Sequence, residues 1–326
     1  MSMPNFTYLK AKSLKEAIGQ LSSKGARIHA GGTDLLGCLR DDIFEAEKLV
    51  SIGQLKTLRG ISQTGDGGLR IGALTTIAEI ENNKILQERY SALSQAASEV
   101  ASPQLRNQGT IGGNICQKPR CWYYRGEFHC LRKGGDTCYA YQGENQFHCI
   151  FGGNMCYIVH PSDTAPALVA FEALVRVSGP SGTRLVPVAK FHVPPSENVQ
   201  KETILKPNEI VTEILLPPPA KGLQSSYRKV RARRSWDFAL ASVALALQFD
   251  GDKIIKARVV FGGAAPVPWR SKEVEEVITG KRLDAETVTS AAAAAVKNSQ
   301  PLKHNGYKIS LFRGMIEEEL TAMARA

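Results

Sequence analysis

The sequence has no apolar segment of the length that crosses a membrane, which takes about 20 residues. Its longest apolar stretches, Ala165–Val177 and Phe238–Phe249, are interrupted, the first by Glu172 and Arg176. The N-terminal segment MSMPNFTYLKAKSLKEAIGQL lacks the basic start, apolar core and small-residue cleavage site of a secretory signal. We therefore expect no membrane span and a cytoplasmic protein, or a periplasmic one if a partner that carries a signal exports it.

The common nucleotide-binding fingerprints are absent as well. The chain contains neither GxGxxG nor GxxxxGK[ST], so neither a Rossmann fingerprint nor a P-loop is indicated. The net charge is +10, and the densest basic run, Tyr227–Arg234, has five Lys or Arg among eight residues. No recognisable nucleic-acid module accompanies this run. We expect no binding of nucleic acid and assign the charge to acidic partner subunits or an anionic cofactor.

Cysteine is scarce except in one segment, which holds six of the seven cysteines. A CxxC pair, the usual hook of a zinc finger or ribbon, does not occur. Three explanations stay open from spacing alone: an iron–sulfur cluster, whose wrapping loop suits wide and uneven gaps, a zinc site, or disulfides. The nearby His129, His148 and His160 keep the zinc site in consideration. The clustered cysteines are Cys116, Cys121, Cys130, Cys138, Cys149 and Cys156, and Cys38 lies apart.

Two glycine-rich turns stand out elsewhere, AGGTDLL at 30–36 and TIGGN at 110–114. We expect each to lie at the end of a strand. Paired glycines let the backbone approach a ligand closely, and their N–H groups form an anion-binding nest, to which Thr33 or Thr110 adds a hydroxyl. Either turn alone is more often structural, but the two together could hold a pyrophosphate from both sides.

The length of 326 residues, 43% of them hydrophobic, allows two or three domains. A helix is predicted at 13–25 with Ser13 as its N-cap, and another at 160–173. The prolines at 217–219 form a natural boundary. Beyond them, three strands and then three helices indicate an α+β domain.

Four motifs in order, RIHAGGTDLL, SPQLRNQGTIGGN, HPSDTAPAL and YRKVRAR, resemble the FAD-binding medium subunits of the xanthine dehydrogenase, aldehyde oxidoreductase and carbon monoxide dehydrogenase family. The resemblance covers essentially the whole chain. It implies an α+β protein with a two-part FAD-binding domain of the xanthine dehydrogenase/vanillyl-alcohol-oxidase type at 1–219, divided into lobes of about 1–58 and 59–219. A cysteine-rich insertion at 116–157 and a small α+β flavoprotein C-terminal domain at 220–326 complete it.

The resemblance also implies which residues bind FAD. The first turn would wrap the pyrophosphate, the second would face it, an acidic residue would lie near the flavin, and a basic residue of the C-terminal domain would pair with that acid. In this sequence these are Arg27, Ile28, His29, Ala30, Gly31, Gly32, Thr33, Asp34 and Leu35, then Thr110, Gly112, Gly113 and Asn114, then Asp163, and finally Lys229.

Most relatives lack the forty residues that follow the GGN turn here. The insertion resembles that of 4-hydroxybenzoyl-CoA reductase and some bacterial aldehyde oxidoreductases, whose flavin subunits carry a [4Fe–4S] cluster. The aldehyde-oxidoreductase-like spacing implies the ligands Cys121, Cys130, Cys138 and Cys156. The benzoyl-CoA-reductase-like alternative has Cys149 in place of Cys130. Cys38 and Cys116 are expected to be small buried hydrophobic residues.

The function implied is electron transfer. The chain supplies no catalytic residue that we identify, so the substrate would react on a molybdopterin-binding large subunit. Electrons would pass through a [2Fe–2S] small subunit to the FAD, and the extra cluster would serve ferredoxin, with NAD as another external partner. We expect a heterotrimer, or a dimer of it, of the aldehyde or xanthine dehydrogenase type.

Three rivals remain. One is a subunit of the 4-hydroxybenzoyl-CoA reductase type with reversed electron flow, and another is a zinc-stabilised, non-catalytic assembly subunit. The third is a covalent-flavin oxidase with His29 as the linking residue.

Overall fold

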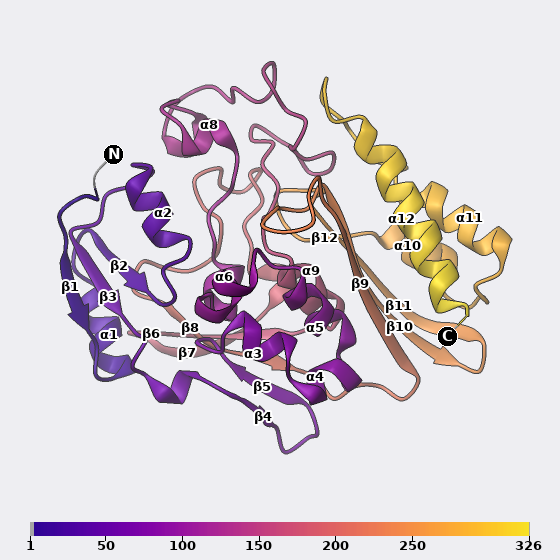
Figure 1. The fold of residues 1–326 in the computed structure, drawn as a ribbon, viewed down its shortest axis with the longest axis horizontal. Coiled ribbons are helices and arrows are strands. Elements are labelled where there is room, and N and C mark those ends of the chain that lie inside the picture. Colours follow the sequence, from indigo (N-terminus) through magenta and orange to yellow (C-terminus); the bar gives the residue numbers. More distant parts are fainter. Residues whose placement is uncertain (1–2, 326) are drawn as a thin grey trace.

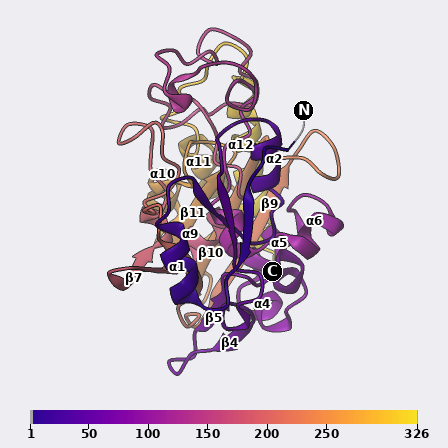
Figure 2. The ribbon, with the colours of Figure 1, turned by 90° about the vertical axis from the view of Figure 1, so that its left-hand side faces the viewer.

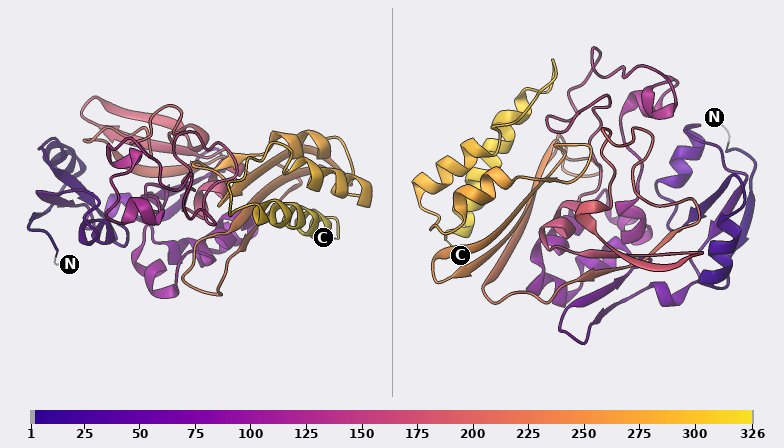
Figure 3. Two further views of the ribbon diagram at one scale, coloured as in Figure 1. Left: turned by 90° about the horizontal axis from the view of Figure 1, so that it is seen from above. Right: turned by 180° about the vertical axis from the view of Figure 1, so that it is seen from behind.

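The computed structural model describes residues 3–325, which form three β-sheets and the helices packed on them. Figure 1 shows the N-terminal sheet in indigo, a central antiparallel sheet, and a C-terminal sheet with three helices beside it. Seen from above, the N-terminal sheet and the C-terminal helices lie at opposite ends of the molecule (Figure 3). The α+β class and the presence of a separate C-terminal unit are as predicted.

The N-terminal sheet is parallel, in the order β1-β3-β2. Its helix α1 begins as predicted, because the Ser13 hydroxyl accepts a hydrogen bond from Glu16 N (3.1 Å), but it ends four residues before the predicted stop at Gly25. The helix α1 connects β1 to β2, the two strands that flank and pair with β3. The elements are β1 (Thr7–Lys10), α1 (Leu14–Leu21), β2 (Ala26–His29), α2 (Leu35–Arg40), β3 (Lys48–Ser51) and the 3₁₀ turn η1 (Lys56–Leu58).

The central sheet is antiparallel, in the order β4-β5-β8-β6-β7. Its buried apolar side chains pack on helices of the same lobe around the fully buried ring of Tyr90, whose hydroxyl donates to Pro217 O (2.7 Å). The strands are β4 (Ile61–Gln63), β5 (Leu69–Gly72), β6 (Leu174–Gly179), β7 (Gly182–Pro187) and β8 (Ile210–Leu216). The helices are α3 (Ile77–Glu81), α4 (Lys84–Arg89), α5 (Ser91–Ser98), α6 (Pro103–Gln108), α7 (Ile111–Ile115) and α9 (Thr164–Ala170), and η3 spans Val188–Lys190.

The C-terminal sheet, in the order β12-β11-β10-β9, is antiparallel. The helices α10 to α12 cover one face, while α5 and α9 of the preceding lobe pack on the other. Three strands and three helices were predicted, and the structure adds the two-residue strand β12. The elements are β9 (Leu223–Val230), β10 (Ala241–Asp250), β11 (Lys253–Gly262), β12 (Trp269–Arg270), α10 (Lys272–Ile278), α11 (Ala285–Ala294) and α12 (Tyr307–Met323).

The cysteine-rich segment at 116–157 has little regular structure, as its lack of periodicity predicts. Only α8 (Trp122–Arg125) and η2 (Leu131–Lys133) form within it. Figures 1 and 2 show it as a set of loops above the sheets. The buried Lys308 of α12 donates from Nζ to Gly263 O (2.8 Å) and to Phe147 O (3.3 Å), which ties these loops to the C-terminal unit.

The helix predicted at 160–173 is shorter than expected. It begins at Thr164, where Ser162 Oγ accepts from Ala165 N (3.1 Å), and it ends at Ala170. Over residues 3–325, no helix is both long enough and apolar enough to cross a membrane.

Candidate functional site

A cleft of about 520 Å3 opens where the two N-terminal lobes, the insertion and a loop of the C-terminal unit meet. Its volume lies in the ~300–1,000 Å3 range typical of cofactor and small-molecule sites. Of the fifteen residues predicted to bind FAD, thirteen line this cleft. His29 and Lys229 are not among the lining residues.

The first glycine turn follows β2, as predicted, and leads into α2. Gly32 has φ +74°, a left-handed conformation that side chains disfavour. A β-carbon on Gly31 would lie 2.0 Å from Gln108 O, and one on Gly32 would lie 2.8 Å from the His29 ring. Both glycines are therefore required by the backbone itself. His29 lies behind the turn, edge-on to the Tyr8 ring, which explains why it does not line the cleft.

The second turn is not a strand end, and that prediction was wrong. Thr110 is the N-cap of α7, and its hydroxyl oxygen accepts from Gly113 N (3.3 Å). Gly112 packs against Ala73, where a β-carbon would come within 2.9 Å of the Ala73 side chain. Thr110 and the glycines still line the cleft. The N–H groups of Ile111 and Gly112 donate to Thr75 O (3.0 Å) and Ala73 O (2.9 Å), so this turn offers the ligand space a close backbone approach rather than free backbone donors.

Asn114 ends this turn, and two hydroxyls fix its side chain. Ser162 Oγ and Thr164 Oγ1 donate to Asn114 Oδ1 at 2.5 and 2.7 Å. With the carbonyl side occupied, the amide N–H2 remains for a ligand. We did not single out Ser162 or Thr164 from the sequence, although both belong to the HPSDTAPAL motif.

Asp163 and Lys229 form the ion pair expected from the resemblance. Their Nζ–Oδ2 distance is 2.8 Å, and the Lys229 side chain is 0% exposed. Tyr227 donates to the other carboxylate oxygen (2.8 Å), and Lys229 also reaches Glu99 O (2.9 Å). Burial raises the pKa of Asp163, and Lys229 opposes this effect. Lys229, which does not itself line the cleft, thus holds the Asp163 carboxylate in position at the cleft wall.

Residues of the insertion also line the cleft, which the sequence did not reveal. Arg120 and Arg125 each place an Nη2 2.8 Å from Asp34 Oδ1, and Lys118 N donates to Asp34 Oδ2 (2.7 Å). The Asp34 carboxylate of the first turn is therefore occupied by the insertion. Trp236 and Phe238 line the cleft from the side of the C-terminal unit. The only local sign of this contact in the sequence is the basic segment QKPR at 117–120, shortly after the GGN turn.

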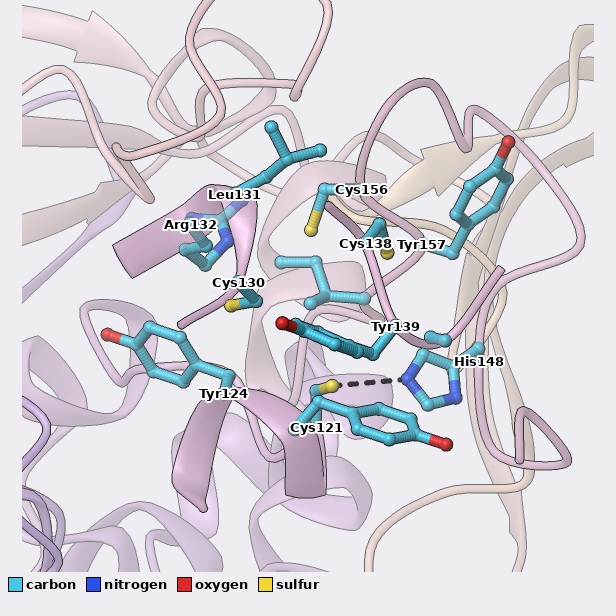
Figure 4. Close-up of a pocket in the computed structure, with 13 residues that line it drawn as sticks. Cys121, Tyr124, Cys130, Leu131, Arg132, Cys138, Tyr139, His148, Cys156 and Tyr157 are labelled. Carbon is cyan, nitrogen blue, oxygen red and sulfur yellow. Dashed lines mark hydrogen bonds between the residues drawn. The ribbon is translucent and has the colours of Figure 1, made fainter. Parts of the chain in front are cut away.

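A second, smaller pocket lies inside the insertion, and Figure 4 shows Cys121, Cys130, Cys138 and Cys156 among its lining residues. Cys149 is buried but does not line this pocket. Its N–H bonds to Tyr157 O and its carbonyl to Asn305 Nδ2 (both 3.0 Å), which holds it toward the C-terminal unit. Cys38 and Cys116 lie outside the pocket.

The electrostatics of this pocket are set by burial and one cation. Burial raises the pKa of Cys121 to about 11. Hydrogen bonding from Cys138 and the neighbouring Arg132 lower the pKa of Cys156 to about 6. His148 Nε2 lies 3.2 Å from Cys121 Sγ, and burial lowers the pKa of His148 to about 4. Within residues 3–325, no group of three or more His, Cys, Asp or Glu side chains is arranged to hold a single metal ion.

Comparison with known proteins gives two family matches that together cover most of the chain. The family described as the FAD binding domain in molybdopterin dehydrogenase matches residues 4–128 and 148–219. The CO dehydrogenase flavoprotein C-terminal domain matches residues 225–323. Residues 129–147, inside the insertion, fall outside both matches.

Individual relatives agree with this assignment. The aldehyde oxidoreductase FAD-binding subunit PaoB of Escherichia coli K12 is 35% identical over 99% of both chains. The carbon monoxide dehydrogenase medium chain of Hydrogenophaga pseudoflava is 29% identical over 99% of this chain and 98% of the relative. A solved carbon monoxide dehydrogenase structure from that organism superposes with a TM-score of 0.76 at 28% identity, covering 98% of this chain and 96% of that one. This chain belongs to the family of FAD-binding medium subunits of the xanthine, aldehyde and carbon monoxide dehydrogenases, oxidoreductases of the molybdenum hydroxylase type.

Proposed function

We propose that the chain binds one FAD in the cleft, with the pyrophosphate between the turns at 30–36 and 110–114. This rests on one observation: the two glycine turns line the same cleft of cofactor size, and in each turn a glycine has no room for a β-carbon. Backbone N–H groups at a glycine turn such as the one at 30–36 favour an anion. The bound flavin would exchange one or two electrons and so connect one-electron clusters with a two-electron partner.

The chain's own residues bind and orient the cofactor. Gly31, Gly32, Gly112 and Gly113 let the backbone approach the phosphates. Asn114, fixed by Ser162 and Thr164, offers its amide, and Asp163 accepts a hydrogen bond from the flavin side of the cleft. Each of these roles is a hypothesis that rests on position in the cleft.

For the second pocket we propose a [4Fe–4S] cluster held by Cys121, Cys130, Cys138 and Cys156. These four residues line one pocket, whereas Cys149 does not line it, and this favours the aldehyde-oxidoreductase-like ligand set. The donor chemistry fits, because thiolates are the protein ligands of such clusters and the pocket offers four. In a cubane each thiolate binds a different iron, so the sulfurs need not converge on one point, as they must around a single ion.

The relatives named above are FAD-binding subunits and medium chains, so we propose that this chain also works in a complex. Its partners would be a molybdopterin-binding large subunit and a [2Fe–2S] small subunit. Ferredoxin or NAD would exchange electrons with the complex. The substrate that the complex oxidises would bind the large subunit. An aldehyde is favoured as this substrate, because the chain is 35% identical to an aldehyde oxidoreductase subunit.

Purification of the native complex tests the proposal. We expect this chain to elute with larger partners in size-exclusion chromatography, to contain FAD in a 1:1 ratio, and to hold iron beyond that of the small subunit. A stable monomer without flavin would refute the FAD proposal. Stoichiometric zinc in place of the extra iron would refute the cluster and favour the zinc-stabilised alternative.

A further inference from the structure

Two guanidinium groups at the rim of the flavin cleft share a single carboxylate. Asp34 is the shared acceptor of Arg120 and Arg125, both from the insertion. Arg125 is well satisfied, because its Nε also donates to Pro119 O (2.8 Å) and its Nη2 to Lys118 O (3.3 Å). Another carboxylate that lines the cleft, Asp41, pairs with Arg40 at 3.5 Å. One carboxylate therefore serves two guanidinium groups.

Arg120 is held in place but is not satisfied. Its Nη2 contacts Asp34 and also donates to Gln117 Oε1 (3.3 Å), and its guanidinium lies 4.9 Å from the centre of the Phe238 ring. Its Nε is buried, and among residues 3–325 no group accepts a hydrogen bond from it. The Arg120 side chain is also 31% exposed and lines the cleft, so an anion in the cleft can reach the guanidinium.

The position of Arg120 identifies where that ligand would lie. Asp34 belongs to the first glycine turn, Phe238 to the loop of the C-terminal unit, and Arg120 bridges the two while lining the cleft. The planar guanidinium binds phosphate in a forked geometry that a lysine does not reproduce. The next residue, Cys121, lines the cysteine pocket, so the chain at 120–121 forms a wall common to both sites.

We propose that Arg120, a residue of the insertion, binds a phosphate group in the flavin cleft. This rests on the proposed function, because the cleft is taken to hold FAD. The phosphate has two sources, the pyrophosphate of FAD itself or the phosphate of a nicotinamide dinucleotide that exchanges electrons with it. Both present the same anion to the same guanidinium.

The test compares Arg120→Gln, which removes the charge, and Arg120→Lys, which keeps it but loses the fork, in the native complex. Arg234→Gln is the matched control, since Arg234 is an exposed arginine of the neighbouring loop. After removal of the flavin, rebinding of FAD, FMN and riboflavin is measured by flavin fluorescence, and the KM for NAD is measured on protein with full FAD. Circular dichroism checks that each variant is folded.

If the phosphate is that of FAD, Arg120→Gln raises the Kd for FAD about 10- to 100-fold, Arg120→Lys by less, and neither changes riboflavin binding. If it belongs to the dinucleotide, FAD binding is unchanged and the KM for NAD rises by a similar factor. Wild-type FAD and NAD behaviour in both variants overturns the assignment of Arg120 and leaves the flavin cleft intact. A wild-type complex that binds no FAD overturns the proposed function, and the assignment with it.

Discussion

The flavin cleft and the cysteine pocket lie side by side but are built from different parts of the chain. The wall of the cleft that would face the pyrophosphate is backbone, in turns fixed at the ends of β2 and at the start of α7. The wall of the cysteine pocket is made of side chains on loops with almost no regular structure.

We therefore expect the cleft to lose its ligand when a side chain is added and the pocket to lose its ligand when a side-chain atom is removed. In the cleft an added β-carbon collides with neighbouring atoms, such as Gln108 O for Gly31 or the His29 ring for Gly32, whereas in the pocket a removed sulfur would take away a ligand of the proposed cluster. A loop of some forty residues inside a compact domain needs something to hold it. Here the ion pairs of Arg120 and Arg125 with Asp34 hold the near end of the insertion, and Lys308 holds the far end.

The largest expected effect is the loss of iron from the insertion. Cys121→Ser, Cys130→Ser, Cys138→Ser and Cys156→Ser should each lower the iron content by about one cluster while FAD largely remains, because a cluster that lacks one thiolate loses an anchoring bond. Iron is measured by plasma mass spectrometry and FAD by absorbance. Cys38→Ser and Cys116→Ser are the controls and should keep their iron.

Cys149→Ser is the discriminating variant of this series. Since Cys149 lies outside the pocket, its replacement should keep the iron. If Cys149→Ser lost iron while Cys130→Ser kept it, the ligand set would be wrong and the benzoyl-CoA-reductase-like arrangement would be right.

The second prediction adds a side chain to the cleft. Gly32→Val should give folded protein depleted of FAD, because Gly32 has φ +74° and its β-carbon would collide with His29. Gly19→Ala is the control, since a β-carbon there meets nothing within 4 Å. Full flavin occupancy in Gly32→Val would show that the first turn does not hold the pyrophosphate.

The third prediction concerns a part of the cleft where side chains do matter. Lys229→Met leaves Asp163 buried without its cation, and removal of one partner of a buried ion pair costs about 3–5 kcal/mol of unfolding free energy. Urea unfolding followed by tryptophan fluorescence measures the loss. The double variant Asp163→Asn/Lys229→Met removes both charges and should recover part of it. Equal stability of the single and double variants would mean that the charge of Asp163 is not the cause.

Much of the fold could be predicted because its signals are local. The Ser13 cap, the glycine turn after β2 and the order of strands and helices beyond residue 217 depend on neighbours in sequence. The wrong prediction for TIGGN also came from a local sequence pattern. TIGGN was taken for a strand end because paired glycines suggest a turn, whereas tertiary packing of Gly112 on Ala73 allows a helix to start there.

What the sequence could not reveal depends on contacts between distant segments. Arg125 meets Asp34 across 91 residues, and no pattern near either residue announces the pair. The sequence favoured Cys130 over Cys149 only through the resemblance, whereas in the structure Cys130 lines the pocket and Cys149, whose carbonyl accepts from Asn305 of the C-terminal unit, does not. His29 was assigned to FAD by its place in the motif, yet its ring lies edge-on to Tyr8 and does not line the cleft.

The smallest expected effect tests the stem of the insertion, where the two regions join. His192 and His160 are buried with ring centres 4.2 Å apart, and His192 Nε2 donates to Ile115 O (2.9 Å), at the point where the insertion begins. Burial lowers the pKa of His192 from 6.5 to about 4, against the opposing effect of the Ile115 hydrogen bond, and burial also lowers that of His160.

The folded protein therefore keeps His192 neutral down to about pH 4, whereas the unfolded chain takes up its proton near pH 6.5. Between these values the unfolded chain binds more protons, so stability falls as the pH decreases, by about 3 kcal/mol for this group. His192→Gln keeps a donor for Ile115 O and removes the titration, so its unfolding free energy should fall less between pH 6.5 and 4 than that of the wild type. The exposed His304→Asn is the control and should follow the wild type. If the unfolding free energy of His192→Gln and of the wild type changed equally with pH, the stem would open before the protein unfolds and the histidines would titrate in solvent. The insertion would then be less firmly joined to the cleft than the structure indicates.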